Sequence, residues 1–143
     1  MEDISLLPQT AEYALRVVVW LAAHAPAKAT SRSLAKATGI PLRYQYRVLQ
    51  ALGREGIVQS RSGPGGGYEL ARPANQITML DVINAVGRIR RIRTCPLARG
   101  AEGSHLCPLH RELDAAFAQI EQAFARVSIG QLVRRASRPL CEA

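Results

Sequence analysis

The chain has 143 residues, of which 48% are apolar and 21% charged, a balance typical of one folded domain rather than of a disordered chain. The 19 lysines and arginines against 11 acidic residues give a net charge of +8, which favours a polyanionic partner, with nucleic acid first and an anionic membrane second. A membrane span is excluded because the most apolar run, 17–23, is only seven residues long. Glu2, Asp3 and Glu12 lie where a secretory signal needs positive charge, so the sequence predicts a cytoplasmic protein.

The first part of the chain predicts two helices separated by a short connection. Residues 10–23 carry apolar side chains at helical spacing, and Thr10 is a candidate N-terminal cap. A second helix starts at Thr30 or Ser31 and stops at Gly39, a residue type that often ends helices.

A third helix follows after one turn. Pro41 suits a first helical position, and the helix over 41–53 buries Val48, Leu49 and Leu52. A short helix, a glycine turn and a longer helix are the spacing of a helix-turn-helix, whose second helix enters the major groove. Tyr44 and Tyr46 point about 200° apart on a helix, so at most one of them reaches the bases. The candidate DNA-contacting residues of this unit are Ser31, Pro41, Arg43, Tyr44, Tyr46 and Arg47.

A β-hairpin is predicted next, with strands over 56–60 and 67–71 and a glycine-rich turn between them. A hairpin that follows a helix-turn-helix is the wing of a winged helix. Glycines let its backbone approach a phosphate or a narrow groove, and Arg61 at the tip would enter the minor groove. The alternative is a flexible hairpin without a partner. The candidate DNA contacts of the wing are Arg61, Gly65, Gly66 and Tyr68.

The second half of the chain predicts a fourth helix over 78–86, a basic linker and a long helix from Pro108. Thr78, with Asp81 three positions on, is predicted to form a capping box at the start of the fourth helix. Apolar residues of the long helix alternate at steps of four and three, the pattern of a coiled-coil seam. Such a helix pairs with its copy in a homodimer or, alternatively, packs back on its own domain. The seam comprises Leu109, Leu113, Ala116, Ile120, Ala123 and Val127.

These elements divide the chain into four parts. Residues 1–87 form the winged helix-turn-helix domain and 88–107 a basic, cysteine-bearing sensor loop, followed by the dimerisation helix and its end over 108–133. Residues 134–143 are predicted to be a disordered tail, which makes Cys141 a poor ligand. The expected fold is mostly α-helical with a small β-hairpin wing.

The segment GPGGGYELARPANQITMLDVINAVG, residues 63–87, resembles the Rrf-type winged-helix transcription regulators, which include IscR-like and NsrR-like proteins. The similarity extends from Tyr13-Ala-Leu-Arg16 to Ser128-Ile-Gly-Gln-Leu132. The resemblance implies a homodimeric bacterial regulator that binds a roughly palindromic site on double-stranded DNA.

The resemblance also implies an iron–sulfur cluster between the fourth helix and the long helix. The family uses three cysteines; Cys95 and Cys107 take the first and third positions, and Ala101 stands at the middle one. His110 matches the histidine ligand of IscR-like members, and Glu12 the acidic ligand of NsrR-like members. Two thiolates, an imidazole and a carboxylate supply two ligands per iron, which favours a [2Fe–2S] cluster.

Other interpretations of the cysteine region stay open. His105 is a rival to His110 as ligand, and Cys95 and Cys107 could be a redox-active thiol pair or inert. The sequence predicts a repressor or activator whose DNA affinity follows cluster state. The alternatives are a cluster-free regulator that senses a thiol oxidant or small molecule, and an electron carrier or enzyme. We expect no enzyme, because the sequence offers neither a Ser-His-Asp set nor paired carboxylates.

Overall fold

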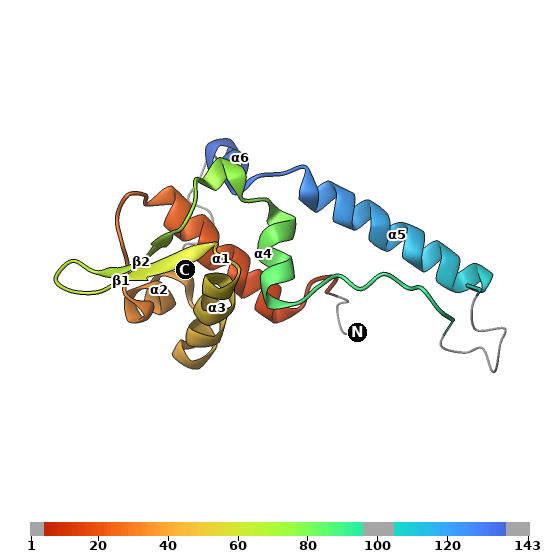
Figure 1. Cartoon of the computed structure of the whole chain (residues 1–143), viewed down its shortest axis with the longest axis horizontal. Helices are drawn as coiled ribbons and strands as arrows, with labels where there is room; N and C mark the ends of the chain where they lie inside the picture. Colours follow the sequence, from red (N-terminus) through yellow and green to blue (C-terminus); the bar gives the residue numbers. More distant parts are fainter. Residues whose placement is uncertain (1–4, 96–104, 137–143) are drawn as a thin grey trace.

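A computed structural model describes residues 5–95 and 105–136 of the chain (Figure 1). It is mostly helical with one two-stranded antiparallel sheet, which confirms the predicted fold class. No helix in this part of the chain is long and apolar enough to cross a membrane. The elements, in chain order, are α1 Gln9–Ala23, α2 Ser31–Thr38, α3 Leu42–Arg54, β1 Val58–Arg61, β2 Gly67–Leu70, the 3₁₀ helix η1 Ala74–Gln76, α4 Met79–Val86, α5 Pro108–Ala125 and α6 Ile129–Arg135.

The core is built around α1, which contacts α2, α3, α4, α6 and β2. Val17 and Leu21 of α1 are buried together with Leu49 and Leu52 of α3 and Val82 of α4. Each fully buried apolar side chain of this size contributes roughly 1.5–3 kcal/mol to folding. The body formed by α1–α4, the wing and α6 therefore has a core of its own.

Local capping fixes both ends of α2 and the start of α4 as the sequence predicts, whereas Pro41 precedes α3 as its N-cap residue and is not its first helical residue. Thr30 caps α2 by accepting a hydrogen bond from the Ser33 N–H at 3.1 Å, and α2 ends at Gly39 with φ 69°. Thr78 and Asp81 form the predicted capping box of α4. The prediction for α1 is wrong: the helix begins at Gln9, so Thr10 lies inside it and caps nothing.

The wing is an antiparallel pair in which Val58 lies opposite Leu70 and Arg61 opposite Gly67. Both strands lie within a residue or two of the predicted ranges. The backbone of Ala29, before α2, exchanges two hydrogen bonds with Tyr68 at 2.8 and 3.1 Å. A Cβ at Gly67 would come within 2.8 Å of the Ala29 backbone, and its φ of 144° disfavours other residues. Gly67 is therefore needed to attach the wing to the body.

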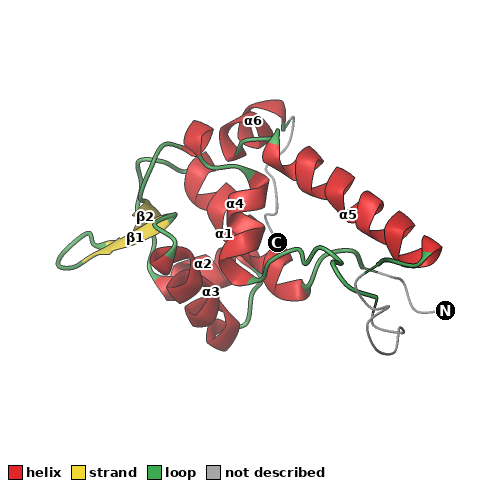
Figure 2. Ribbon diagram, turned by 45° about the vertical axis from the view of Figure 1, so that its right-hand side comes forward, coloured by secondary structure: helices red, strands yellow, loops and turns green. Residues whose placement is uncertain are grey.

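The sequence did not predict α6. The seam pattern runs to Val127, but α5 ends at Ala125 and a new helix starts at Ile129, within the Ser128–Gln131 capping box. Ile129 is fully buried, and its N–H donates to the Ile77 carbonyl at 2.8 Å. This helix extends to Arg135, past the boundary at 133 predicted for the tail; residues 137–143 lie outside the described residues. The chain thus returns to the body after α5, which itself extends away from it (Figures 1 and 2).

Candidate DNA-binding surface and cysteine–histidine site

The two tyrosines of α3 face different ways, as their spacing predicts. The Tyr44 ring is half-buried, with its centroid 6.0 Å from that of Tyr13 on α1. The Arg43 guanidinium lies 4.7 Å from the centre of the Tyr44 ring and donates to its hydroxyl at 3.1 Å. Tyr46, in contrast, is 53% exposed. Tyr46 is therefore the tyrosine that faces solvent, and Tyr44 holds Arg43 in place.

Three polar side chains of the helix-turn-helix are buried: Ser31, Gln45 and Thr38, whose hydroxyl donates to the Leu34 carbonyl at 2.7 Å. Ser31 is only 8% exposed, so its hydroxyl is poorly placed to reach DNA, whereas Pro41 and Arg47 are exposed. Gln45 is fully buried, and neither its amide atoms nor the Ser31 hydroxyl has a hydrogen-bond partner among the described residues. The sequence signal for Gln45 is its spacing to Val48, Leu49 and Leu52, which puts it on the buried stripe of α3.

A groove of about 640 Å³ separates the exposed face of α3 from the wing. Hydrogen-bonding side chains from both elements line it together with the apolar Leu49 and Val58, so α3 and the wing share one surface of mixed polarity. The hydrogen-bonding side chains are Tyr46, Arg47 and Gln50 of α3 and Gln59, Ser60 and Tyr68 of the wing.

Arg61 is the last residue of β1, not the tip of the turn. Its Nε lies 2.7 Å from Oε1 of Glu69, and Gln59 donates to the same oxygen at 2.8 Å. The hydrogen bonds from Arg61 and Gln59 lower the pKa of Glu69. Because exposed ion pairs contribute little stability, Arg61 can exchange this contact for a phosphate at small cost.

The structure explains the glycines at positions 65 and 66 of the turn in different ways. A Cβ at Gly66 would collide with the carbonyl oxygens of Arg61 and Gly63, so the turn itself requires glycine there. Gly65 has a φ of 70° and open space around its Cβ position. Close approach to DNA is therefore not needed to explain Gly66, while Gly65 leaves that approach unobstructed.

Cys95, Cys107 and His110 converge at the far end of α5 from the body. The His110 Nδ1 lies 3.0 Å from the Cys107 Sγ and 3.5 Å from the Cys95 Sγ. All three ligand atoms lie within 4.8 Å of one another, and the two thiols are not joined in a disulfide. Thiolates and imidazole are iron and zinc ligands, so this donor set fits a bound metal or an iron–sulfur cluster.

The other predicted ligands are not part of this group. Glu12 is exposed in the first turn of α1, and the described chain does not bring it to the cysteines. His105 is exposed and also lies outside the group, whereas His110 belongs to it. Ala101 and Cys141 fall outside the described residues.

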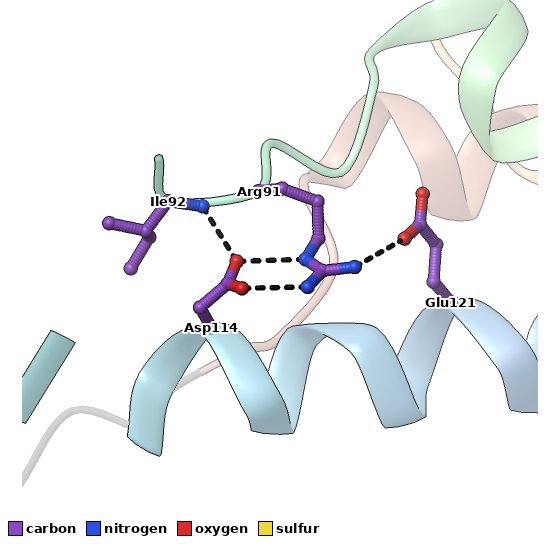
Figure 3. A network of polar contacts seen from close by, with 4 residues as sticks. All are labelled: Arg91, Ile92, Asp114 and Glu121. Atoms are coloured by element: carbon purple, nitrogen blue, oxygen red, sulfur yellow. Dashed lines mark hydrogen bonds and ion pairs between the residues drawn. The ribbon is translucent and has the colours of Figure 1, made fainter. Parts of the chain in front are cut away.

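A polar network attaches the linker to α5 close to the cysteine–histidine group (Figure 3). Arg91 donates to both carboxylate oxygens of Asp114, through Nε at 2.8 Å and a terminal nitrogen at 2.6 Å. The Ile92 N–H donates to Asp114 at 2.8 Å, and Glu121 lies 3.7 Å from Arg91. The hydrogen bonds from Arg91, supported by that from Ile92, lower the pKa of Asp114 to about 2. We call these four residues the linker clamp; sequence reasoning missed it.

A profile of Rrf2, described as an iron-dependent transcriptional regulator, matches residues 7–135. The chain belongs to the Rrf2 family. The HTH-type transcriptional regulator IscR of Xenorhabdus nematophila is 32% identical over 96 residues, covering 67% of this chain and 58% of that protein. The match to the Rrf2 family confirms the resemblance seen in the sequence. The name of this IscR relative describes it as a transcription regulator.

Solved structures of Rrf2-like fold agree with the architecture. The structure of IscR from T. potens matches with a TM-score of 0.75 and 18% identity, covering 96% of this chain and 93% of that one. CymR, the global cysteine regulator of B. subtilis, matches with a TM-score of 0.74 and 22% identity over 96% of this chain and all (100%) of its own. As an Rrf2-family protein of this fold, the chain is a winged-helix transcription regulator.

Proposed function

We propose that this Rrf2-family protein is a cytoplasmic, homodimeric repressor whose affinity for DNA is set by an iron–sulfur cluster at Cys95, Cys107 and His110. The convergence of two cysteines and a histidine, side-chain types that can bind iron, from two separate segments supports the proposal. The linker and α5 meet at this group. Its chemical state therefore bears on how α5 is held relative to the body.

DNA recognition is assigned to the surface that combines α3 and the wing. Tyr46 and Arg47 line the groove between them, and the chain carries a net charge of +8. Arginine paired with a guanine edge is the commonest specific contact in the major groove. Arg61 and the backbone at Gly65 are assigned to phosphate or minor-groove contacts.

Dimerisation is assigned to α5. In the described structure no residue of α5 is buried, and two of its leucines are open to solvent, Leu109 at 61% and Leu113 at 42%. The described chain leaves Leu109 and Leu113 of the apolar seam open, and such a seam fits a second copy of the same helix. Two copies would present two α3 helices to a roughly palindromic operator, with half-sites one helical turn apart.

The cluster is proposed as [2Fe–2S] because the ligand set is mixed. Two cysteines and a histidine supply three ligands, and Glu12 of a second copy is the candidate for the fourth. When bound, such a cluster supplies a one-electron redox centre whose potential an imidazole ligand raises.

Thiol sensing without a cluster is the second candidate. Cys95 and Cys107 lie within 4.8 Å of each other with an imidazole nitrogen in contact with both. CymR, the global cysteine regulator, shares the fold. A disulfide formed by an oxidant would tie the linker to α5 in the same place as a cluster would.

Purification under anaerobic conditions separates the two candidates. We expect visible absorbance, iron and acid-labile sulfide in the wild-type protein, their loss in Cys107→Ala, and full retention in the matched control Cys141→Ala. DNA binding in a mobility-shift assay should follow cluster content. Wild-type protein without iron or sulfide, or equal DNA affinity of cluster-loaded and cluster-free protein, would contradict the cluster switch.

A further inference from the structure

The segment that carries Cys95 has no regular structure to fix its position. Residues 87–95 belong to neither a helix nor a strand, whereas Cys107 and His110 are fixed at the start of α5. Cys95 is nevertheless 92% buried, at 8% exposure, and lies 3.5 Å from His110. Some contact along this linker must hold the cysteine against the helix.

The geometry points to Asp114 as the positioning residue that holds Cys95 against Cys107 and His110 before any metal is bound. Asp114 acts through Arg91 and Ile92, which lie four and three residues before Cys95. The inference rests on the metal-binding role proposed above for this group. It does not depend on whether the bound metal is a cluster.

The position of Asp114 on α5 supports this role. Asp114 follows His110 by four residues, so both side chains lie on one face of the helix, one turn apart. Asp114 anchors the linker on that face, one turn away from the ligand that Cys95 must meet. Glu121 lies two turns further along and meets the same arginine at 3.7 Å.

The contacts at Asp114 fix both the position and the orientation of the linker. The two parallel hydrogen bonds from Arg91 define the plane of the guanidinium, and the Ile92 N–H adds a backbone contact. A lysine could supply the charge but not this paired geometry. Residues that orient metal ligands in this way typically matter by about 10–100-fold in metal affinity.

Cobalt(II) alone is the probe that tests the inference, because its spectrum reports thiolate ligands without any cluster. Full-length, cluster-free, reduced protein is titrated anaerobically with Co²⁺, and the thiolate-to-cobalt absorbance is followed. We expect the wild type to bind and Asp114→Asn to bind about 10–100-fold more weakly, with the same spectrum at saturation. The matched control Glu121→Gln should bind within about threefold of wild type, because its contact with Arg91 is the longest of the clamp.

Arg91→Lys is the second variant, for use if Asp114→Asn fails to fold by circular dichroism. It keeps the charge and loses the paired hydrogen bonds, and we expect it to weaken Co²⁺ binding by an amount between the other two variants. Unchanged Co²⁺ affinity in Asp114→Asn or, if that variant does not fold, in Arg91→Lys would overturn the inference. A changed spectrum at saturation would also overturn it, since Asp114 would then be a ligand. Failure of the wild type to bind Co²⁺ would do the same.

The outcomes for this inference and for the cluster are separable. Loss of Co²⁺ affinity in Asp114→Asn, with no iron or sulfide in the anaerobic wild type, keeps the positioning role and rejects the cluster. Unchanged Co²⁺ affinity in that variant, with iron and sulfide present in the wild type, rejects the positioning role and keeps the cluster.

Discussion

The body and the arm of this protein are held together by different forces. In the body, α1, α3, α4 and α6 share a dry core whose residues, such as Val17, Leu52 and Ile129, are fully buried. In the arm, formed by the linker and α5, no helix residue is buried in the described chain, and the clamp of Arg91 and Asp114 is polar. The body can fold by its own apolar burial. Under the function proposed above, a second copy of the chain or a bound metal completes the arm.

The largest effect should come from charges on the arm. The double variant Leu113→Glu/Ile120→Glu should be monomeric, because two carboxylates on the seam of α5 would have to be desolvated in a dimer. Tight operator binding should then be lost, while the body stays folded. Sedimentation velocity measures the oligomeric state and circular dichroism the fold. A dimeric double variant would remove α5 as the interface.

A matched pair of leucine truncations tests the contrast in burial. Leu52→Ala should lower the free energy of unfolding by about 2–5 kcal/mol, since its side chain is fully buried in the body. Leu109→Ala removes the same atoms from a side chain that is 61% exposed in the single chain. At concentrations low enough to give monomers, we expect it to cost less than about 1 kcal/mol in urea unfolding. Equal losses in the two variants would mean that α5 is covered within its own chain.

The sequence predicts the body of the protein better than it predicts the arm. The start of α2 at Thr30 or Ser31, the capping box at Thr78 and the stop at Gly39 were predicted because each depends on residues close in the chain. Thr10 was predicted wrongly because the helix starts directly after Pro8. Local rules therefore serve the body well, except where a competing start signal lies two residues away, as Pro8 does from Thr10.

The missed features depend on contacts between distant residues. The helix α6 was missed because the seam pattern continues to Val127, past the end of α5 at Ala125, although Ser128 and Gln131 form a capping box that signals a new helix. The clamp joins residues that are 23 apart in sequence, so no periodicity reveals it. The group of Cys95, Cys107 and His110 came from the family resemblance, and the structure brings these three together without Glu12.

Smaller effects are expected on DNA affinity, and they should differ between Arg47 on α3 and Arg61 on the wing. Arg47→Ala should cost about 1–3 kcal/mol in binding to the specific operator and little on random DNA, because arginine on the recognition helix reads base edges. Arg61→Ala should weaken both DNAs similarly and reduce the salt slope by about one, as for a lost phosphate contact. Fluorescence anisotropy at several salt concentrations measures both. Equal loss on specific and random DNA for Arg47→Ala would show that it does not read bases.

The smallest expected effect is the opening of the Arg91–Asp114 contact at low pH, which tests whether polar contacts hold the arm together. The pKa of Asp114 is lowered to about 2, below the ordinary value of about 3.9, mainly by the hydrogen bonds from Arg91. A depressed carboxyl pKa gives stability that is fully present above the unfolded value and is lost as the pH falls through the folded one. The clamp should therefore be intact from neutral pH down to about pH 3 and be half open near pH 2, where the folded-state carboxyl takes up its proton. The Ile92 amide, which donates to Asp114, reports this in ¹H–¹⁵N spectra: its shift should stay constant to about pH 3 and then move with a midpoint near pH 2. Asp114→Asn should abolish the movement, whereas a midpoint near 3.9 in the wild type would mean that Arg91 does not hold the carboxylate in solution.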